Sequence, residues 1–241
     1  MKSILKYTLA IATTLFFINT SQAQFSKVKG NGDITTKTHQ TSDYNEIKVV
    51  GFMDVKLESG TEGSITVTTD DNIQEHIVVE SKNGVLTIKV KNKVNIQTKK
   101  GVHVTVPFKS LNKVSLTGSG DVLTSNTIKS DSFEVELTGS GDVILDVEAM
   151  TVDAKITGSG DLKLTGKATD LEVKVTGSGD YTGKTLISKN TQVYVSGSGD
   201  ASVYASKSLK ARVNGSGDIT YTGNPETTDK KVMGSGDIDS N

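Results

Sequence analysis

Seven copies of the tetrapeptide Gly-Ser-Gly-Asp carry the residues of this sequence that are best suited to chemistry. Their aspartates follow one another at intervals of 21, 19, 19, 20, 18 and 19 residues. Calcium prefers oxygen ligands, so a row of carboxylates contributed by successive repeats could form a calcium ladder. The candidate metal ligands are Asp121, Asp142, Asp161, Asp180, Asp200, Asp218 and Asp237.

A structural role explains the same tetrapeptide more simply. Glycine allows the positive φ of a tight corner, and an aspartate side chain can accept a hydrogen bond from a backbone N–H two residues further on. Calcium-binding nonapeptide β-rolls have a period about half as long as this one. Neighbouring carboxylates about 5 Å apart repel by roughly 0.8 kcal/mol in water, so an exposed row needs no metal. We therefore expect calcium to be optional at best, and the sequence indicates no other cofactor.

Signals for catalysis are weak. His39, His76 and His103 have neither metal-ligand nor nucleophile–base spacing. The absence of cysteine excludes disulfides, thiolate zinc sites, cysteine nucleophiles and a lipid-modified N-terminal cysteine. The sequence contains no Trp, and its net charge of -1 gives no global field to attract nucleic acid. We predict a protein that is not an enzyme and has no nucleic-acid partner.

A β-helix enzyme that cleaves acidic polysaccharides is the enzymatic alternative. Such enzymes combine clustered aspartates with basic residues on one face, and one repeat position here holds Lys155, Lys174 and Arg212. The position two residues earlier holds Asp153, Glu172 and Lys210. This mixture is typical of a solvated charged face and does not predict a groove for a polyanion.

The elements that must position these residues are β-strands. Apolar residues stand seven and five residues before each of the first six aspartates, and mostly polar ones stand eight and six before it, an alternation typical of half-buried strands. The residues predicted to point inward are Val114, Leu116, Val135, Leu137, Ala154, Ile156, Val173, Val175, Val193, Val195, Ala211 and Val213. Alternation resumes after each aspartate, so each repeat is predicted to be a strand, a corner, a second strand and a variable return.

A period near 19 residues favours a coil over a meander. In a coil, equivalent strands of successive repeats pair in parallel about 4.8 Å apart, and every corner stacks on the next. The fold class is therefore all-β and solenoid-like. Lys230 and Met233 make the last repeat a degenerate cap, and open solenoid ends carry a risk of weak self-association.

The segment 34–108 lacks the tetrapeptide but is also rich in strand patterns. We interpret it as an irregular β layer continuous with the repeat solenoid at 109–241, because no linker separates the two. The mature chain, 24–241, is thus predicted to be a single domain. Gly30-Asn31-Gly32-Asp33 resembles the tetrapeptide and is interpreted as a detached copy.

Residues 1–23 are predicted to be a signal peptide. Lys2 and Lys6 precede the apolar run Leu9 to Ile18, and Ser21-Gln22-Ala23 fits a cleavage site before Gln24. Ten apolar residues rise only about 15 Å as a helix, half of the hydrocarbon core, and no later stretch approaches spanning length. We expect an exported protein that is periplasmic, associated with the outer membrane or extracellular, and not a Cys-anchored lipoprotein.

Together these features resemble one protein family. A leader, a β-rich first half containing Asn83-Gly84-Val85-Leu86-Thr87-Ile88, the step Val106 to Leu111 and the repeated Gly-Ser-Gly-Asp are similar to the auto-transporter adhesin head GIN domain family of secreted bacterial proteins. The resemblance implies a right-handed parallel β-helix-like fold and a setting in the cell envelope or at the surface, with no catalytic residues to carry over.

The leading functional hypothesis is a non-enzymatic adhesin or scaffold that presents a repetitive β-ladder surface to a surface glycan or protein. The alternatives are a calcium-stabilised binding module and a polysaccharide-active β-helix enzyme.

Overall fold

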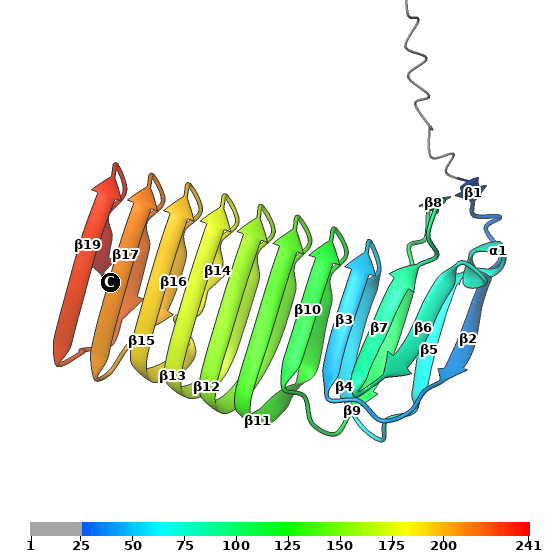
Figure 1. Cartoon of the computed structure of the whole chain (residues 1–241), viewed down its shortest axis with the longest axis horizontal. Coiled ribbons are helices and arrows are strands. Elements are labelled where there is room, and N and C mark those ends of the chain that lie inside the picture. Colours follow the sequence, from blue (N-terminus) through cyan, green and yellow to red (C-terminus); the bar gives the residue numbers. More distant parts are fainter. Residues whose placement is uncertain (1–25) are drawn as a thin grey trace, which may run out of the picture.

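The computed structural model describes residues 26–241, which form a right-handed parallel β-solenoid (Figure 1). The predicted signal peptide lies outside these residues. In each coil one strand runs to a corner at one long edge, and a second strand returns behind it, so that two layers of strands face each other (Figure 1). Successive coils pair in parallel, and the predicted fold class is confirmed.

The repeat part keeps one register from coil to coil. Val135 pairs with Ala154, Ala154 with Val173, and Val173 with Val193, so equivalent repeat positions stack in straight rows. β11 to β13 are long because each continues through the bend opposite the corner, and thus serves both layers. The strands are β10 (Lys113–Gly118), β11 (Val122–Gly139), β12 (Val143–Gly158), β13 (Leu162–Gly177), β14 (Tyr181–Thr182), β15 (Leu186–Gly197), β16 (Ala201–Tyr204), β17 (Ser208–Gly215), β18 (Ile219–Thr222), β19 (Thr227–Gly234) and β20 (Ile238–Ser240).

The N-terminal part continues the same sheet but changes the strand order. β3 lies between β7 and β10, and β4 lies between β9 and β11, so the coil that comes first in the chain is the second from the end in space. β2, β5 and β6 pair antiparallel with their partners and close this end. The elements are β2 (Ile34–Gln40), β3 (Glu46–Gly51), β4 (Asp54–Ser59), β5 (Ser64–Asp70), α1 (Asp71–Gln74), β6 (Ile77–Lys82), β7 (Val85–Val90) and β9 (His103–Phe108).

Two short strands stand outside this sheet. β1 (Ser26–Lys29) and β8 (Val94–Gln97) pair in parallel with each other as a separate ribbon beside α1. Among residues 26–241, α1 spans four residues, and no helix has the length and apolarity needed to cross a bilayer.

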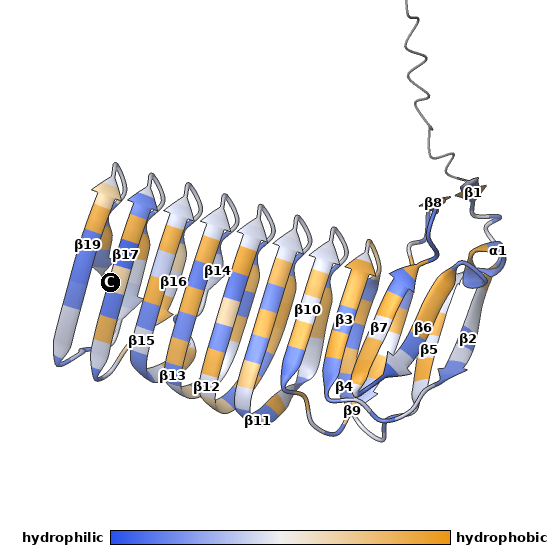
Figure 2. Cartoon of the chain, viewed as in Figure 1, coloured by the Kyte–Doolittle hydropathy of each residue, from blue (hydrophilic) through white to orange (hydrophobic). Residues whose placement is uncertain are grey.

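The core fills the narrow space between the two layers. Inward residues such as Val135, Ala154 and Val173 are fully buried, as the alternation predicts. Figure 2 shows the alternation as orange and blue bands that line up across neighbouring strands. Burying a side chain such as Val or Leu contributes about 1.5–3 kcal/mol, and no single coil could gain this without its neighbours.

Candidate functional site

The seven predicted aspartates lie in one row along the corner edge. Each carboxylate except that of Asp237 accepts a hydrogen bond from the backbone N–H of the aspartate in the next coil, at 2.8 to 3.0 Å. The sequence predicts that each aspartate accepts from the backbone N–H two residues further along the same repeat. That prediction is wrong, because the hydrogen bond joins two neighbouring coils. We name this arrangement the aspartate row.

Both glycines of each corner are crowded by the preceding coil, and the first also needs a positive φ. The first has positive φ, for example +127° at Gly158, as expected for a tight corner. The second does not have positive φ. A Cβ at Gly160 would lie 2.0 Å from the carbonyl oxygen of Gly141 in the preceding coil, so stacking distance excludes a side chain there.

An eighth aspartate, missed by sequence reasoning, starts the row. Gly51 pairs with Gly118, and the N–H of Asp121 donates to Asp54 Oδ1 at 3.4 Å. The corner Gly51-Phe52-Met53-Asp54 keeps only the first Gly and the final Asp of the tetrapeptide. A Gly followed three residues later by Asp was the sequence feature that could have identified this corner. His103 lies beside this corner, with Nδ1 3.4 Å from Asp54 Oδ2.

The variant Gly30 to Asp33 is not a copy of the corner. Its Gly32 N–H donates to the Asp70 carboxylate at 2.7 Å, and its Asp33 carbonyl accepts from the N–H of Asp71. These bonds place the segment against α1 at the N-terminal end, away from the stacked corners.

Each coil contributes one carboxylate to the aspartate row. Within residues 26–241 no group of three or more His, Asp or Glu side chains is arranged to hold a metal ion. One oxygen of each bonded aspartate already accepts a backbone N–H. That calcium is optional at best in this row remains a prediction.

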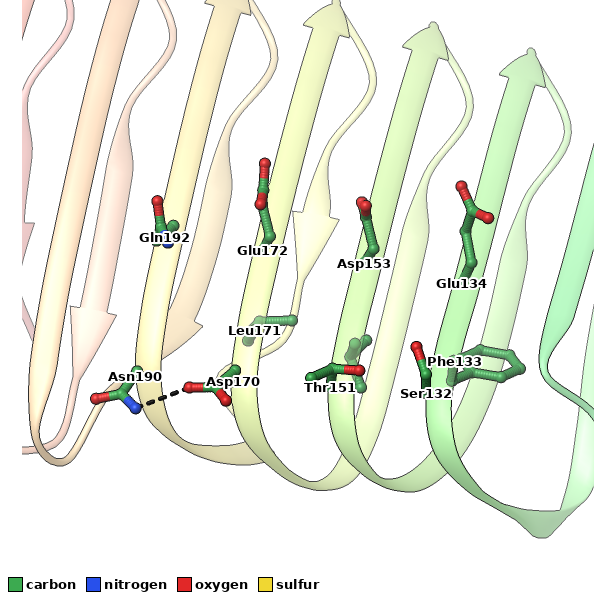
Figure 3. Close-up of a pocket in the computed structure, with 11 residues that line it drawn as sticks. Ser132, Phe133, Glu134, Thr151, Asp153, Asp170, Leu171, Glu172, Asn190 and Gln192 are labelled. Carbon is green, nitrogen blue, oxygen red and sulfur yellow. Dashed lines mark hydrogen bonds between the residues drawn. The ribbon is translucent and has the colours of Figure 1, made fainter.

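A groove of about 420 Å³ crosses the outer face of β11, β12, β13 and β15 (Figure 3). We name it the front groove. Two rows of polar side chains line it, each with one residue per strand in direct register. The rows are Glu134, Asp153, Glu172 and Gln192, and Ser132, Thr151, Asp170 and Asn190. Asn190 donates to the Asp170 carboxylate at 2.8 Å.

Two lysines, Lys155 of the neighbouring row and Lys113 of the coil before Glu134, set the charge state at one end of the front groove. Lys155 Nζ lies 2.7 Å from Glu134 Oε1, and Lys113 Nζ lies 3.1 Å from Glu134 Oε2. The hydrogen bond from Lys155, aided by that from Lys113, lowers the pKa of Glu134 to about 2. The Glu134 hydrogen bond in turn raises the pKa of Lys155. Glu134 therefore stays ionised, whereas a glycosidase general acid needs a raised pKa.

Comparisons with known proteins agree with this fold. The family model described as "Putative auto-transporter adhesin, head GIN domain" matches residues 43–225. A search of curated proteins finds no match.

Solved structures similar to this chain include one described as a putative adhesin from Bacteroides fragilis, with a TM-score of 0.85 and 24% identity over 89% of this chain and 100% of that chain. Two others come from Parabacteroides distasonis, and each is 26% identical over 90% of this chain and 100% of its own. One is described as a putative lipid binding protein, with a TM-score of 0.76, and the other as a putative adhesin, with a TM-score of 0.73. The match to the family model covers most of the solenoid. The chain therefore belongs to the putative auto-transporter adhesin, head GIN domain family.

Proposed function

We propose that this protein is an exported, non-enzymatic adhesin or scaffold of the cell envelope or surface, and that its front groove binds a hydroxyl-rich, uncharged glycan. One observation carries the proposal. The front groove offers the same kinds of hydrogen-bonding side chain on four consecutive strands, at the roughly 4.8 Å strand spacing. A surface of that kind suits a polymer with repeating units.

The chemistry of the front groove matches sugar hydroxyls. Carboxylates accept hydrogen bonds, amides both donate and accept, and the hydroxyls of Ser132 and Thr151 do the same. Asp153 Oδ1 is a buried atom with no hydrogen-bond partner among residues 26–241, and a ligand hydroxyl could donate to it. In the part of the chain that the structure describes, four carboxylates and no basic residue line the groove, and Lys113, Lys155 and Lys174 are already paired with three of them. The groove therefore offers no unpaired cation to an acidic glycan, and neutral glycans are favoured.

The polar lining fits a glycan better than an acyl chain. Phe133, Val152 and Leu171 belong to the lining but are at most 2% exposed, because their side chains pack in the core. The description of one relative as a lipid binding protein therefore has no counterpart in the front groove. The ionised Glu134 also supports binding without cleavage.

Binding to immobilised neutral polysaccharides tests the proposal. Asp170→Ala with Asn190→Ala removes one bonded pair from the front groove, and we expect at least a tenfold loss of affinity. Asp33→Ala with Asn92→Ala is the matched control, because both residues are exposed at the far end of the solenoid. Equal loss in both variants, or no binding by the unaltered protein across a broad neutral panel, would contradict the assignment.

Protease treatment of intact cells, beside a lysed control, tests the location. Degradation in intact cells is the result expected for an adhesin on the surface. Protection until lysis would place the protein in the periplasm, where a scaffold role would replace adhesion.

A further inference from the structure

Six lysines surround the β1–β8 ribbon at the N-terminal end of the solenoid. All six are exposed, and none forms an ion pair with another residue in 26–241. No acidic residue occurs between Lys91 and Val102. We name this surface the basic tip, and its members are Lys27, Lys29, Lys91, Lys93, Lys99 and Lys100.

The chain segment that carries most of the basic tip is longer than is needed to connect one solenoid strand to the next. Residues 91–102 connect β7 to β9, whereas residues 159–161 suffice to connect β12 to β13. The long connection contributes β8, which pairs with β1 outside the 18-stranded sheet (Figure 1). Four of the six lysines lie in this connection.

The loops of the basic tip are held in place from below. Asp70 is 2% exposed, and its carboxylate accepts the Gly32 N–H at 2.7 Å and the Thr98 hydroxyl at 2.6 Å. Gly30 packs so closely that a Cβ there would lie 2.5 Å from this carboxylate. The backbone beside Lys29 and Lys99 is thereby fixed against α1.

Several lysines elsewhere on this protein, though not all of them, form ion pairs with neighbouring carboxylates. The gathering of six unpaired lysines at one end points to an external anion. Lys113 and Lys155 each lie within hydrogen-bond distance of Glu134. In the basic tip none of the six lysines forms an ion pair with another described residue, and Lys29, Lys99 and Lys100 line one hollow in which Asp70 is the single carboxylate. The excess of like charge costs electrostatic energy until an anionic surface neutralises it.

We propose that the basic tip docks on the anionic headgroups of a lipid bilayer. Its lysines lie on β1 and on the turns on both sides of β8, a spread that fits a flat surface better than a single linear polyanion. Docking by this end leaves the front groove free, so this inference is independent of glycan binding.

Vesicle co-sedimentation of the exported protein tests the inference, once mass spectrometry has confirmed its N-terminus. We expect binding to vesicles of one part phosphatidylglycerol to two parts phosphatidylcholine, no binding to phosphatidylcholine alone, and release by high salt. Lys93→Gln, Lys99→Gln and Lys100→Gln together should weaken the partition coefficient about a hundredfold, about fivefold for each lysine.

A triple variant of the same charge supplies the control. Lys184→Gln, Lys189→Gln and Lys207→Gln changes exposed lysines on distant coils, and it should bind within about threefold of the unaltered protein. Equal loss in both triple variants, equal binding to neutral vesicles, or binding to soluble polyphosphate without binding to anionic vesicles would overturn the proposal.

Discussion

The backbone N–H of Asp161 donates a hydrogen bond to Asp142 Oδ1 at 3.0 Å, and these two residues belong to different coils. The Asp161 carboxylate repeats the contact with the N–H of Asp180 at 2.9 Å. The corner aspartate therefore joins coils together, and its exact repetition along the chain reflects a bond that each coil makes to the next.

Removing one carboxylate from the middle of the aspartate row should weaken the fold. Asp161→Ala leaves the Asp180 N–H without its acceptor, and we expect a loss of about 1 kcal/mol in the free energy of unfolding, measured by urea denaturation. Asp161→Asn keeps an acceptor oxygen and should lose less. Asp237→Ala is the control, because within residues 26–241 its side chain accepts no backbone N–H from a further coil, and an equal loss there would contradict the interpretation.

The second glycine of a corner should tolerate no side chain. Gly160→Ala would place a methyl group 2.0 Å from the Gly141 carbonyl oxygen, and separating the coils to relieve this should cost about 3 kcal/mol or more. Gly60→Ala meets nothing closer than Pro107 at 3.4 Å and should be nearly neutral. Thermal melts of both variants make the comparison, and similar melting temperatures would show that the coils can separate freely.

Stability should fall in acid as Glu134 is protonated. Its pKa is lowered from 4.5 to about 2 in the folded protein, so its contribution is complete above pH 4.5 and is lost as the pH falls toward 2. With allowance for solvent screening, we expect Glu134→Gln to cost about 1 kcal/mol at pH 7 and little near pH 2, measured as unfolding free energies across that range. The exposed Glu226→Gln controls for charge alone, and a cost for Glu134→Gln that did not depend on pH would exclude the ion pair as its cause.

Calcium removal should leave the melting temperature nearly unchanged. The aspartate row already has backbone N–H partners, and repulsion between exposed carboxylates about 5 Å apart is small in water. Melts with added calcium and with a chelator measure the effect. A fall of tens of degrees on chelation would instead establish the row as a structural calcium site.

Lys230 should limit pairing between solenoid ends. It takes the inward position that Ala211 holds in the preceding coil, and its Nζ lies 4.3 Å from the centre of the Tyr221 ring, over the end of the core. An inward charge on an edge strand disfavours addition of another strand. Lys230→Val should therefore self-associate more strongly in sedimentation velocity than Lys231→Val, which changes an outward residue. Equal behaviour of the two variants would contradict this role.

The sequence by itself determined the repeating part of the molecule. The alternation of apolar and polar residues with a period of two showed which side chains face the core, as at Val135 and Val173. The repeat period near 19 residues showed that the coils stack. Both signals are local and are repeated many times, so the position of the predicted aspartates along one edge followed from them directly.

Only the tertiary structure decided which residues meet across coils. The partner of each corner aspartate, the place of Asp54 at the start of the row, and the lysines around Glu134 all depend on which coil lies beside which. The β3–β4 coil pairs with β7 and β9, which follow it in the chain, and residues 34–108 carry no periodic marker of that order. The basic tip was missed for the same reason, because its lysines come from segments about 60 residues apart that only the β1–β8 pairing brings together.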